Sequence, residues 1–311
     1  MIARLTGSFW FRLAVTLAVL VYLALQIDLG ETARALLRLP FWTIVAVAGL
    51  LAIDRGVIIW RWIILIRATG QRVAAKSAAW IYLISSFVGS FTPGGIGGDA
   101  ARAYTLRQRT SQGSDAVASI AMDRVLGLFS LILVGLAGAI AWGRQTGRPA
   151  AVLFVLAAAG AAGCIALLWA DRWIRALVPT PWRDAGAGAR LTRMADALSQ
   201  YRGQPAALGS VMLLSIALQL LRILQAWLLG TGIGITVPFA YYLVFMPIGL
   251  IGLLLPISLG GFGLPQGFIV ALLQTQRVDA PEALALSTLI VLSGLAANLP
   301  GAWLYLRQRR A

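Results

Sequence analysis

Residues 92–102 read TPGGIGGDAAR and follow the apolar run AWIYLISSFVGSF at residues 79–91. Four glycines and a proline would interrupt a helix here, because glycine loses backbone entropy in a helix and proline removes a backbone donor. An acid, Asp99, and a base, Arg102, follow at a spacing of three, which places them on one face of a helix that resumes. The stretch therefore predicts a helix that breaks and turns back, with a charged pair just after the turn.

The composition around this stretch is typical of a membrane protein. Of 311 residues, 59% are hydrophobic and 12% are charged, which is about half the charged fraction of a soluble domain. The formal net charge is +15, and most bases lie in short segments between apolar runs, as expected of loops that face the cytoplasm and anionic lipid. We predict an all-α polytopic membrane protein in the inner (cytoplasmic) membrane, and we expect no nucleic-acid binding.

The inventory of reactive side chains excludes many classes of enzyme. The chain has no histidine and one cysteine, Cys164, which lies in an apolar run. A disulfide framework, haem ligation by histidine and a Ser-His-Asp triad therefore cannot be built, and the sequence contains no Walker A motif. We expect no cofactor, no metal site and no catalytic residue, and we do not predict an enzyme.

Apolar segments outline the topology, because about 20 such residues cross a bilayer as a helix. We predict about seven transmembrane helices, at residues 13–26, 41–66, 116–142, 150–170, 206–229, 239–255 and 282–306. Residues 77–109, and the break PISLGGFGLPQGF at residues 256–268, are interpreted as two re-entrant hairpins broken by glycine and proline. The basic loops all fall on the cytoplasmic side, together with both termini, only if both breaks are re-entrant.

The two breaks also resemble each other. The first reads PGGIGG and the second LGGFGL, and in this topology they enter from opposite faces. Paired interruptions favour an inverted repeat with a binding site between its halves. We therefore expect one integral membrane domain, residues 1–311, with halves 1–170 and 204–311 joined by a basic cytoplasmic linker, 171–203. Two unrelated loops with ordinary turn glycines are the alternative.

Charged residues inside apolar segments are candidates for a site. Asp54 and Arg61 share one helical face, and Asp123 and Arg124 lie in a later segment. A charge at bilayer depth costs on the order of 3 kcal/mol, so it usually faces a partner or a water-filled route. Snorkelling arginines, helix capping and structural ion pairs are the alternative readings.

Four motifs resemble a known family in their order and spacing. They are RWIILIRATG at residues 61–70, SFTPGGIGGDAARAYTLRQR at 90–109, ASIAMDRVLGL at 118–128 and PISLGGFGLPQGF at 256–268. The chain is similar here to the flippase-like integral membrane family that includes the transmembrane region of lysylphosphatidylglycerol synthases. The resemblance implies movement of a lipid, typically a phospholipid with a modified headgroup, from the inner to the outer leaflet. The soluble aminoacyl-transfer domain of the synthases is absent from this sequence, so we do not expect the synthase activity.

The resemblance also implies a set of substrate-binding residues. They are Arg61, Gly94, Gly97, Gly98, Asp99, Arg102, Asp123, Arg124, Gly260, Gly261, Gly263 and Gln266. The arginines would attract the lipid phosphate with help from glycine N–H groups, and the aspartates would hold the arginines or couple to protons. Gln266 departs from the family, which commonly has glutamate there, and this weakens the expectation of a cationic, aminoacylated lipid.

The leading hypothesis is therefore a lipid flippase or facilitator, whose partners are membrane lipids. The alternatives are an intramembrane enzyme on a lipid-linked substrate, with Asp99 or Asp123 as base, and an ion or small-solute transporter. A homo-oligomer or a partner protein of lipid biosynthesis also remains open. The hypothesis predicts that Arg102→Ala and Asp123→Ala abolish transfer between leaflets without loss of folding.

Overall fold

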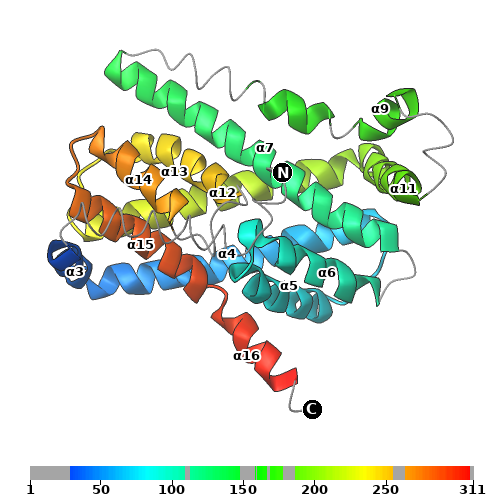
Figure 1. The fold of residues 1–311 in the computed structure, drawn as a ribbon, viewed down its shortest axis with the longest axis horizontal. Helices are drawn as coiled ribbons and strands as arrows, with labels where there is room; N and C mark the ends of the chain where they lie inside the picture. Colours follow the sequence, from blue (N-terminus) through cyan, green and yellow to red (C-terminus); the bar gives the residue numbers. More distant parts are fainter. Residues whose placement is uncertain are drawn as a thin grey trace, which may run out of the picture.

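A computed structural model describes residues 29–108, 113–147, 158, 160–166, 169–177, 186–254 and 263–308. All regular secondary structure in these residues is helical (Figure 1). The first half contains α3 (Leu29–Leu37), α4 (Phe41–Ala68), α5 (Ala75–Ser90), the 3-10 turn η1 (Pro93–Gly95), α6 (Ile96–Arg107) and α7 (Gly113–Thr146). The linker and second half contain α9 (Ala170–Leu177), α11 (Gly186–Gln200), η2 (Tyr201–Gly203), α12 (Pro205–Gly232), α13 (Phe239–Leu254), α14 (Leu264–Gln274), α15 (Ala280–Ala296) and α16 (Leu299–Gln308).

Four stretches within the described residues are long and apolar enough to cross a membrane. They are α4, residues Asp115–Thr146 of α7, α12, and Ala280–Arg307, which joins α15 to α16. The predicted segments 41–66, 116–142, 206–229 and 282–306 are thus confirmed as candidate spans, and the chain is a multi-pass membrane protein. The predicted span 13–26 lies outside the described residues, as does most of 150–170.

The predicted span at 239–255 corresponds to α13, which has 16 residues and is described as far as Leu254. Residues 255–262 lie outside the described residues, so the C-terminal limit of this span stays a prediction. The predicted count of about seven spans is not confirmed in the described part of the chain, where four stretches are long enough.

Helices α4 and α12 form the centre of the molecule and run antiparallel. Three contacts establish the direction: Thr43 with Gly232, Asp54 with Arg222, and Arg61 with Ser215. The partner number on α12 falls as the residue number on α4 rises, which is the pattern of an antiparallel pair. Helix α7 packs against both helices, so the three long helices enclose the polar residues that they carry.

The stretch TPGGIGGDAAR forms the turn between α5 and α6. Gly94 and Gly95 adopt positive φ values of 57° and 71°, a left-handed conformation that glycine tolerates best, and two such residues in succession reverse the chain. Helices α5 and α6 then pack side by side. A Cβ atom on Gly98 would lie 2.4 Å from the backbone oxygen of Ser85, so the absence of a side chain permits this close approach.

Helices α13 and α14 form a second pair of short helices. Helices α5, α6 and α14 have 16, 12 and 11 residues, fewer than the roughly 17–25 that cross a bilayer, and 16 residues of α13 are described. Helices α5 and α6, with η1 between them, have the helix–turn–helix form that a re-entrant hairpin requires. The connection between α13 and α14 lies outside the described residues, and entry from opposite membrane faces stays a prediction.

The order of helix lengths repeats in the two halves. Helices α4, α5, α6 and α7 run long, short, short, long, and a similar order holds for α12, α13, α14 and the joined stretch Ala280–Arg307. The antiparallel packing of α4 and α12 relates the halves in opposite directions (Figure 1). These observations favour the inverted repeat, which stays a prediction together with the boundaries 1–170 and 204–311.

The linker between the halves is folded against the bundle. Helices α9 and α11 pack together, and α11 also packs on α7. Both terminal nitrogens of Arg202 donate to the carboxylate of Asp171, at 2.5 and 2.8 Å. The Tyr201 hydroxyl donates to the backbone oxygen of Leu65 at 3.0 Å, near the end of α4 where helix carbonyls lack helical partners. The linker thus caps one end of the transmembrane bundle.

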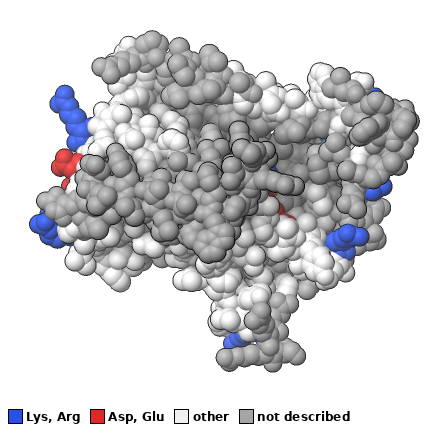
Figure 2. Space-filling model, in the orientation of Figure 1, with Lys and Arg blue, Asp and Glu red and all other residues white. Residues whose placement is uncertain are grey.

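Charged side chains lie at the edges of the visible surface. On the face shown in Figure 2, the blue and red side chains of the described residues stand mainly at the ends and at the lower tip, and the described surface between them is white apart from a small red area near the centre. Such a distribution fits a molecule whose middle faces lipid and whose ends face water.

Candidate functional site

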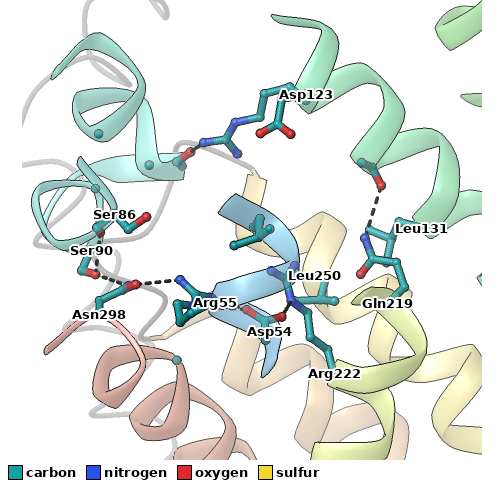
Figure 3. A pocket seen from close by; sticks show the side chains of 18 of the residues that line it. Asp54, Arg55, Ser86, Ser90, Asp123, Leu131, Gln219, Arg222, Leu250 and Asn298 are labelled. Carbon is teal, nitrogen blue, oxygen red and sulfur yellow. Dashed lines mark hydrogen bonds and ion pairs between the residues drawn. The ribbon is translucent and has the colours of Figure 1, made fainter. Parts of the chain in front are cut away.

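A cavity of about 680 Å³ opens among the helices of both halves. Its lining comes from α4, α5, α6, α7, α12, α13 and α15. Charged and amide side chains line part of the cavity, and leucine, isoleucine, valine and methionine side chains supply much of the apolar lining. Figure 3 shows the polar residues converging from helices that are far apart in the sequence. The cavity therefore offers both a polar and an apolar surface to one ligand.

The first group of charges, the Asp123 cluster, consists of Arg61, Asp99, Arg102, Asp123 and Arg124. The two oxygens of Asp123 lie 2.6 Å from Arg61 and 3.3 Å from Arg102. The two oxygens of Asp99 lie 3.0 Å from Arg102 and 2.8 Å from Arg124. The cluster thereby joins α4, α6 and α7 through an alternating chain of acids and bases.

Arg61 and Arg102 are held firmly inside this cluster. The guanidinium carbon of Arg102 lies 5.1 Å from the ring centroid of Trp62 and 4.9 Å from that of Tyr82, within range of a cation–π interaction. Arg61 donates to the Ser215 hydroxyl at 3.0 Å. Both arginines are buried, so their principal contacts are with the protein itself.

Arg124 is the accessible arginine of the Asp123 cluster. Its side chain is 43% exposed, it lines the cavity, and its Nη2 reaches the backbone oxygen of Gly94 at 3.3 Å. Asp99 holds its Nε, which fixes the direction of the guanidinium group. Arg124 is consequently the member best placed to meet an anion that enters the cavity.

The second group of charges, the Asp54 cluster, consists of Asp54, Arg55 and Arg222 with Asn298 and Ser90. Asp54 is buried and accepts from Arg55 at 2.6 Å and from Arg222 at 2.8 Å. Arg55 also donates to Asn298 at 2.9 Å, and Asn298 donates to Ser90 at 2.7 Å. Figure 3 shows this chain of contacts crossing the cavity wall. The cluster ties α4 and α12 to α5 and to the junction of α15 with α16.

The two clusters give the cavity a net positive charge. The Asp123 cluster has three arginines and two aspartates, and the Asp54 cluster has two arginines and one aspartate. Each cluster therefore carries a net charge of +1. Guanidinium groups bind phosphate oxygens through paired, planar hydrogen bonds, so the arrangement suits a phosphate-bearing ligand.

Helical spacing explains why these residues meet. Asp54 and Arg61 are seven residues apart on α4, and Ser215 and Arg222 are seven apart on α12. Seven residues make nearly two full turns, so each pair lies on one helical face. The antiparallel packing then sets Arg61 against Ser215 and Asp54 against Arg222.

Comparison with known protein families identifies the relatives of the chain. A family profile described as the lysylphosphatidylglycerol synthase transmembrane region matches residues 9–300. The chain belongs to this family. Comparisons with curated proteins and with solved structures gave no match. Membership in the lysylphosphatidylglycerol synthase transmembrane family indicates a membrane protein of lipid metabolism or translocation.

The structure brings together most of the binding residues that the family resemblance implied. The cavity is lined by Arg61, Gly94, Gly98, Asp99, Arg102, Asp123 and Arg124. Gly97 is not among the lining residues, and its N–H donates to the Thr92 hydroxyl at 3.1 Å. That glycine N–H is therefore occupied within the protein rather than free for an anion.

The second break contributes differently from the first. Gln266 and Gly263 do not line the cavity. The Gln266 side chain accepts from the backbone N–H of Gly263 at 3.1 Å and donates to Thr288 at 3.2 Å, so it caps the start of α14. Gly260 and Gly261 lie outside the described residues. Both hydrogen bonds of the Gln266 side chain are thus made within the protein, which indicates a structural role.

Several cavity residues were not among the predicted binding residues. They are Arg55, Asn298, Gln219, Arg222 and Gln225. A sequence signal exists for three of them: Gln219, Arg222 and Gln225 recur at a spacing of three on an otherwise apolar helix, which puts them near one face.

Among the described residues, no group of three acidic, histidine or cysteine side chains could hold a metal ion.

Proposed function

We propose that the chain moves a polar-headgroup lipid with an anionic phosphate between the leaflets of the membrane. The observation that carries this proposal is a cavity that combines apolar walls with two arginine clusters, each of net charge +1. A lipid has the same two parts, an ionic headgroup and apolar chains. A small ion or a sugar has no apolar chain that would contact the apolar walls.

In the proposed mechanism, the headgroup phosphate enters the cavity and meets Arg124. Asp99 holds the Nε atom of Arg124 and the Gly94 oxygen accepts from Nη2, which orients the guanidinium group and leaves Nη1 for the phosphate. Asp123 offsets part of the positive charge of Arg61 and Arg102 and so keeps the buried part of the path from binding the phosphate too tightly. The acyl chains stay against apolar side chains or in the bilayer, and movement follows the lipid gradient.

The charge of the cavity also bears on the identity of the headgroup. A cationic aminoacylated headgroup would need a carboxylate free to pair with it, whereas Asp54, Asp99 and Asp123 all bind arginines. Gln266, at the position of the family's glutamate, is neutral and caps α14. These features favour an anionic phospholipid over an aminoacylated one.

A leaflet-sidedness assay tests the proposal. Purified protein in phosphatidylcholine vesicles would be given fluorescent phosphatidylglycerol, and an impermeant quencher would report how much label reaches the outer leaflet. We expect transfer with the wild type and a loss of about tenfold or more with Arg124→Gln, since a hydrogen bond to a charged group contributes about 1.5–3 kcal/mol. Arg307→Gln is the matched control, because Arg307 is exposed and contacts Trp303.

The same vesicles distinguish the other hypotheses. A new lipid species on chromatography would indicate an intramembrane enzyme, and uptake of a solute without lipid movement would indicate a solute transporter. Equal transfer by Arg124→Gln and the wild type would contradict the proposed role of the arginine. Vesicles with no transfer above protein-free controls would contradict the proposed function.

A further inference from the structure

We propose that the Asp54 cluster is a second phosphate-binding station, deeper in the membrane than Arg124, to which the headgroup passes during transfer. This inference rests on the proposed function and assigns a site to residues outside the predicted set. Arg222 and Arg55 supply the positive charge, and Gln219 and Gln225 complete the station.

The depth of the station follows from the aromatic residues of α4. Trp42 and Trp60 are both exposed on this helix, as is typical of aromatic belts at the two membrane interfaces. They are eighteen residues apart, or about 27 Å at 1.5 Å per residue, which matches the hydrocarbon core. Asp54 lies about 9 Å inward from Trp60 by the same rise, so its cluster is near the middle of the bilayer.

The terminal nitrogens of Arg222 can donate hydrogen bonds to a ligand. Its Nε donates to Asp54, and its side chain is 29% exposed although it sits within an apolar helix that lines the cavity. Among the described residues its terminal nitrogens donate to no other side chain. The Asp54 carboxylate thus orients Arg222 in the same way that Asp99 orients Arg124, by holding Nε.

Two glutamines beside Arg222 have unused hydrogen-bonding capacity. Gln219 and Gln225 are 5% and 6% exposed and line the cavity. The Oε1 atom of Gln219 and the Nε2 atom of Gln225 are buried without a partner in the described structure. A buried polar atom without a partner costs free energy, so these atoms point to a ligand that has both acceptor and donor groups, such as a phosphate ester with hydroxyls.

The two stations are matched in charge and close together. Each has a net charge of +1, and Asp54 and Arg61 are seven residues apart on α4, about 10 Å along the axis. Passage through a membrane requires sites that bind well enough to admit a ligand and weakly enough to release it. Two stations of net charge +1 meet that requirement for a monoanionic phosphate, because each attracts the phosphate about equally and neither holds it more strongly than the other.

Two variants test the deeper station. Arg222→Gln and Arg55→Gln each bring its net charge from +1 to zero, and Arg55→Gln leaves the Asp54–Arg222 pair intact. Transfer of fluorescent phosphatidylglycerol and of zwitterionic phosphatidylethanolamine would be measured in vesicles. Equilibrium binding of dioctanoyl phosphatidylglycerol would be measured on the full chain in detergent. Arg307→Gln is the control, and thermal unfolding reports folding.

We expect both variants to transfer phosphatidylglycerol on the order of tenfold to a hundredfold more slowly, as for the loss of a charge-assisted hydrogen bond, with a smaller effect on phosphatidylethanolamine. A structural defect alone would slow both lipids equally, and that result would overturn the inference, as would unchanged phosphatidylglycerol transfer. If Arg222→Gln does not fold, Arg55→Gln carries the test.

Failure of the proposed function would give a different result. If the wild type transfers no lipid, binding of dioctanoyl phosphatidylglycerol decides the matter by itself. Weaker binding by Arg222→Gln or Arg55→Gln than by Arg307→Gln would support the station without transport. Equal binding by all three variants would overturn it.

Discussion

Residues of the same type have different roles in this cavity. Arg102 contacts two carboxylates and two aromatic rings and is buried, whereas Arg124 is largely accessible from the cavity. A buried arginine with all its partners satisfied stabilises the fold, and an accessible one can bind a ligand. Sequence position alone could not separate these two roles, because each arginine lies within three residues of an aspartate, Asp99 or Asp123.

Burial changes the expectation for Asp123→Ala at the residue scale. The substitution leaves Arg61 and Arg102 buried without their shared counter-ion, and breaking a buried pair costs about 3–5 kcal/mol. We therefore expect a loss of unfolding free energy of this size in a denaturation experiment in detergent. Asp99→Ala is the comparison, and we expect a smaller loss because Asp99 is 26% exposed. Equal stability of Asp123→Ala and the wild type would contradict this account.

At the element scale, the α5–α6 pair depends on close backbone contact. Gly98→Ala would place a Cβ atom 2.4 Å from the Ser85 backbone oxygen, so the two helices must separate. We expect a loss of about 1–3 kcal/mol, the usual cost of overpacking, measured as a lower unfolding temperature.

Gly56→Ala provides the matched control for Gly98→Ala. A Cβ atom on Gly56 would meet no atom within 4 Å, and alanine is favoured over glycine in a helix by about 0.5–1 kcal/mol. We expect unchanged or higher stability for this variant. A larger loss with Gly56→Ala than with Gly98→Ala would contradict the proposed packing of the turn.

The linker helices have a pH dependence that follows from one ion pair. The side-chain hydrogen bonds from Arg202 lower the pKa of Asp171 below its usual value, which is about 3.9. A carboxylate with a lowered pKa stabilises the folded state above its unfolded pKa and loses this effect as the pH falls through the folded pKa. Docking of α9 on η2 should therefore weaken below about pH 4.

Limited proteolysis of the linker at stepped pH with an acid-active protease would measure this effect. Cleavage near α9 should increase as the pH falls below about 4. Asp171→Asn should show greater cleavage already at neutral pH, with little further pH dependence. If Asp171→Asn is cleaved with the same pH dependence as the wild type, the role of the ion pair is contradicted.

At the scale of the whole molecule, the antiparallel packing of α4 and α12 predicts that the loops after these two helices lie on opposite sides of the membrane. Ala74 follows α4 and Thr236 follows α12, and both are exposed. In a Cys164→Ala background, an impermeant maleimide should label Ala74→Cys from the cytoplasmic side, because Arg72 and Lys76 adjoin it and basic loops remain inside. Thr236→Cys should be labelled from the other side. Labelling of both from one side would contradict the topology.

Much of this organisation could be predicted from local patterns. The spans at 41–66, 116–142, 206–229 and 282–306 were predictable because long apolar runs must form helices that satisfy their backbone groups in lipid. The turn at TPGGIGGDAAR was predictable because successive glycines and a proline interrupt a helix. The charge pairs between helices were not predictable, because an apolar segment does not reveal which helix packs against it.

By itself, the sequence determined the membrane class, the interrupted helix, the family and the presence of charged residues within apolar helices. Only the tertiary structure decided which charges meet: Asp54 with Arg222, across 168 residues of chain, and Arg61 with Asp123. It also decided that Arg102 is enclosed while Arg124 and Arg222 face the cavity. Periodicity assigns a residue to a face of its own helix, but the neighbour of that face is set by packing between helices.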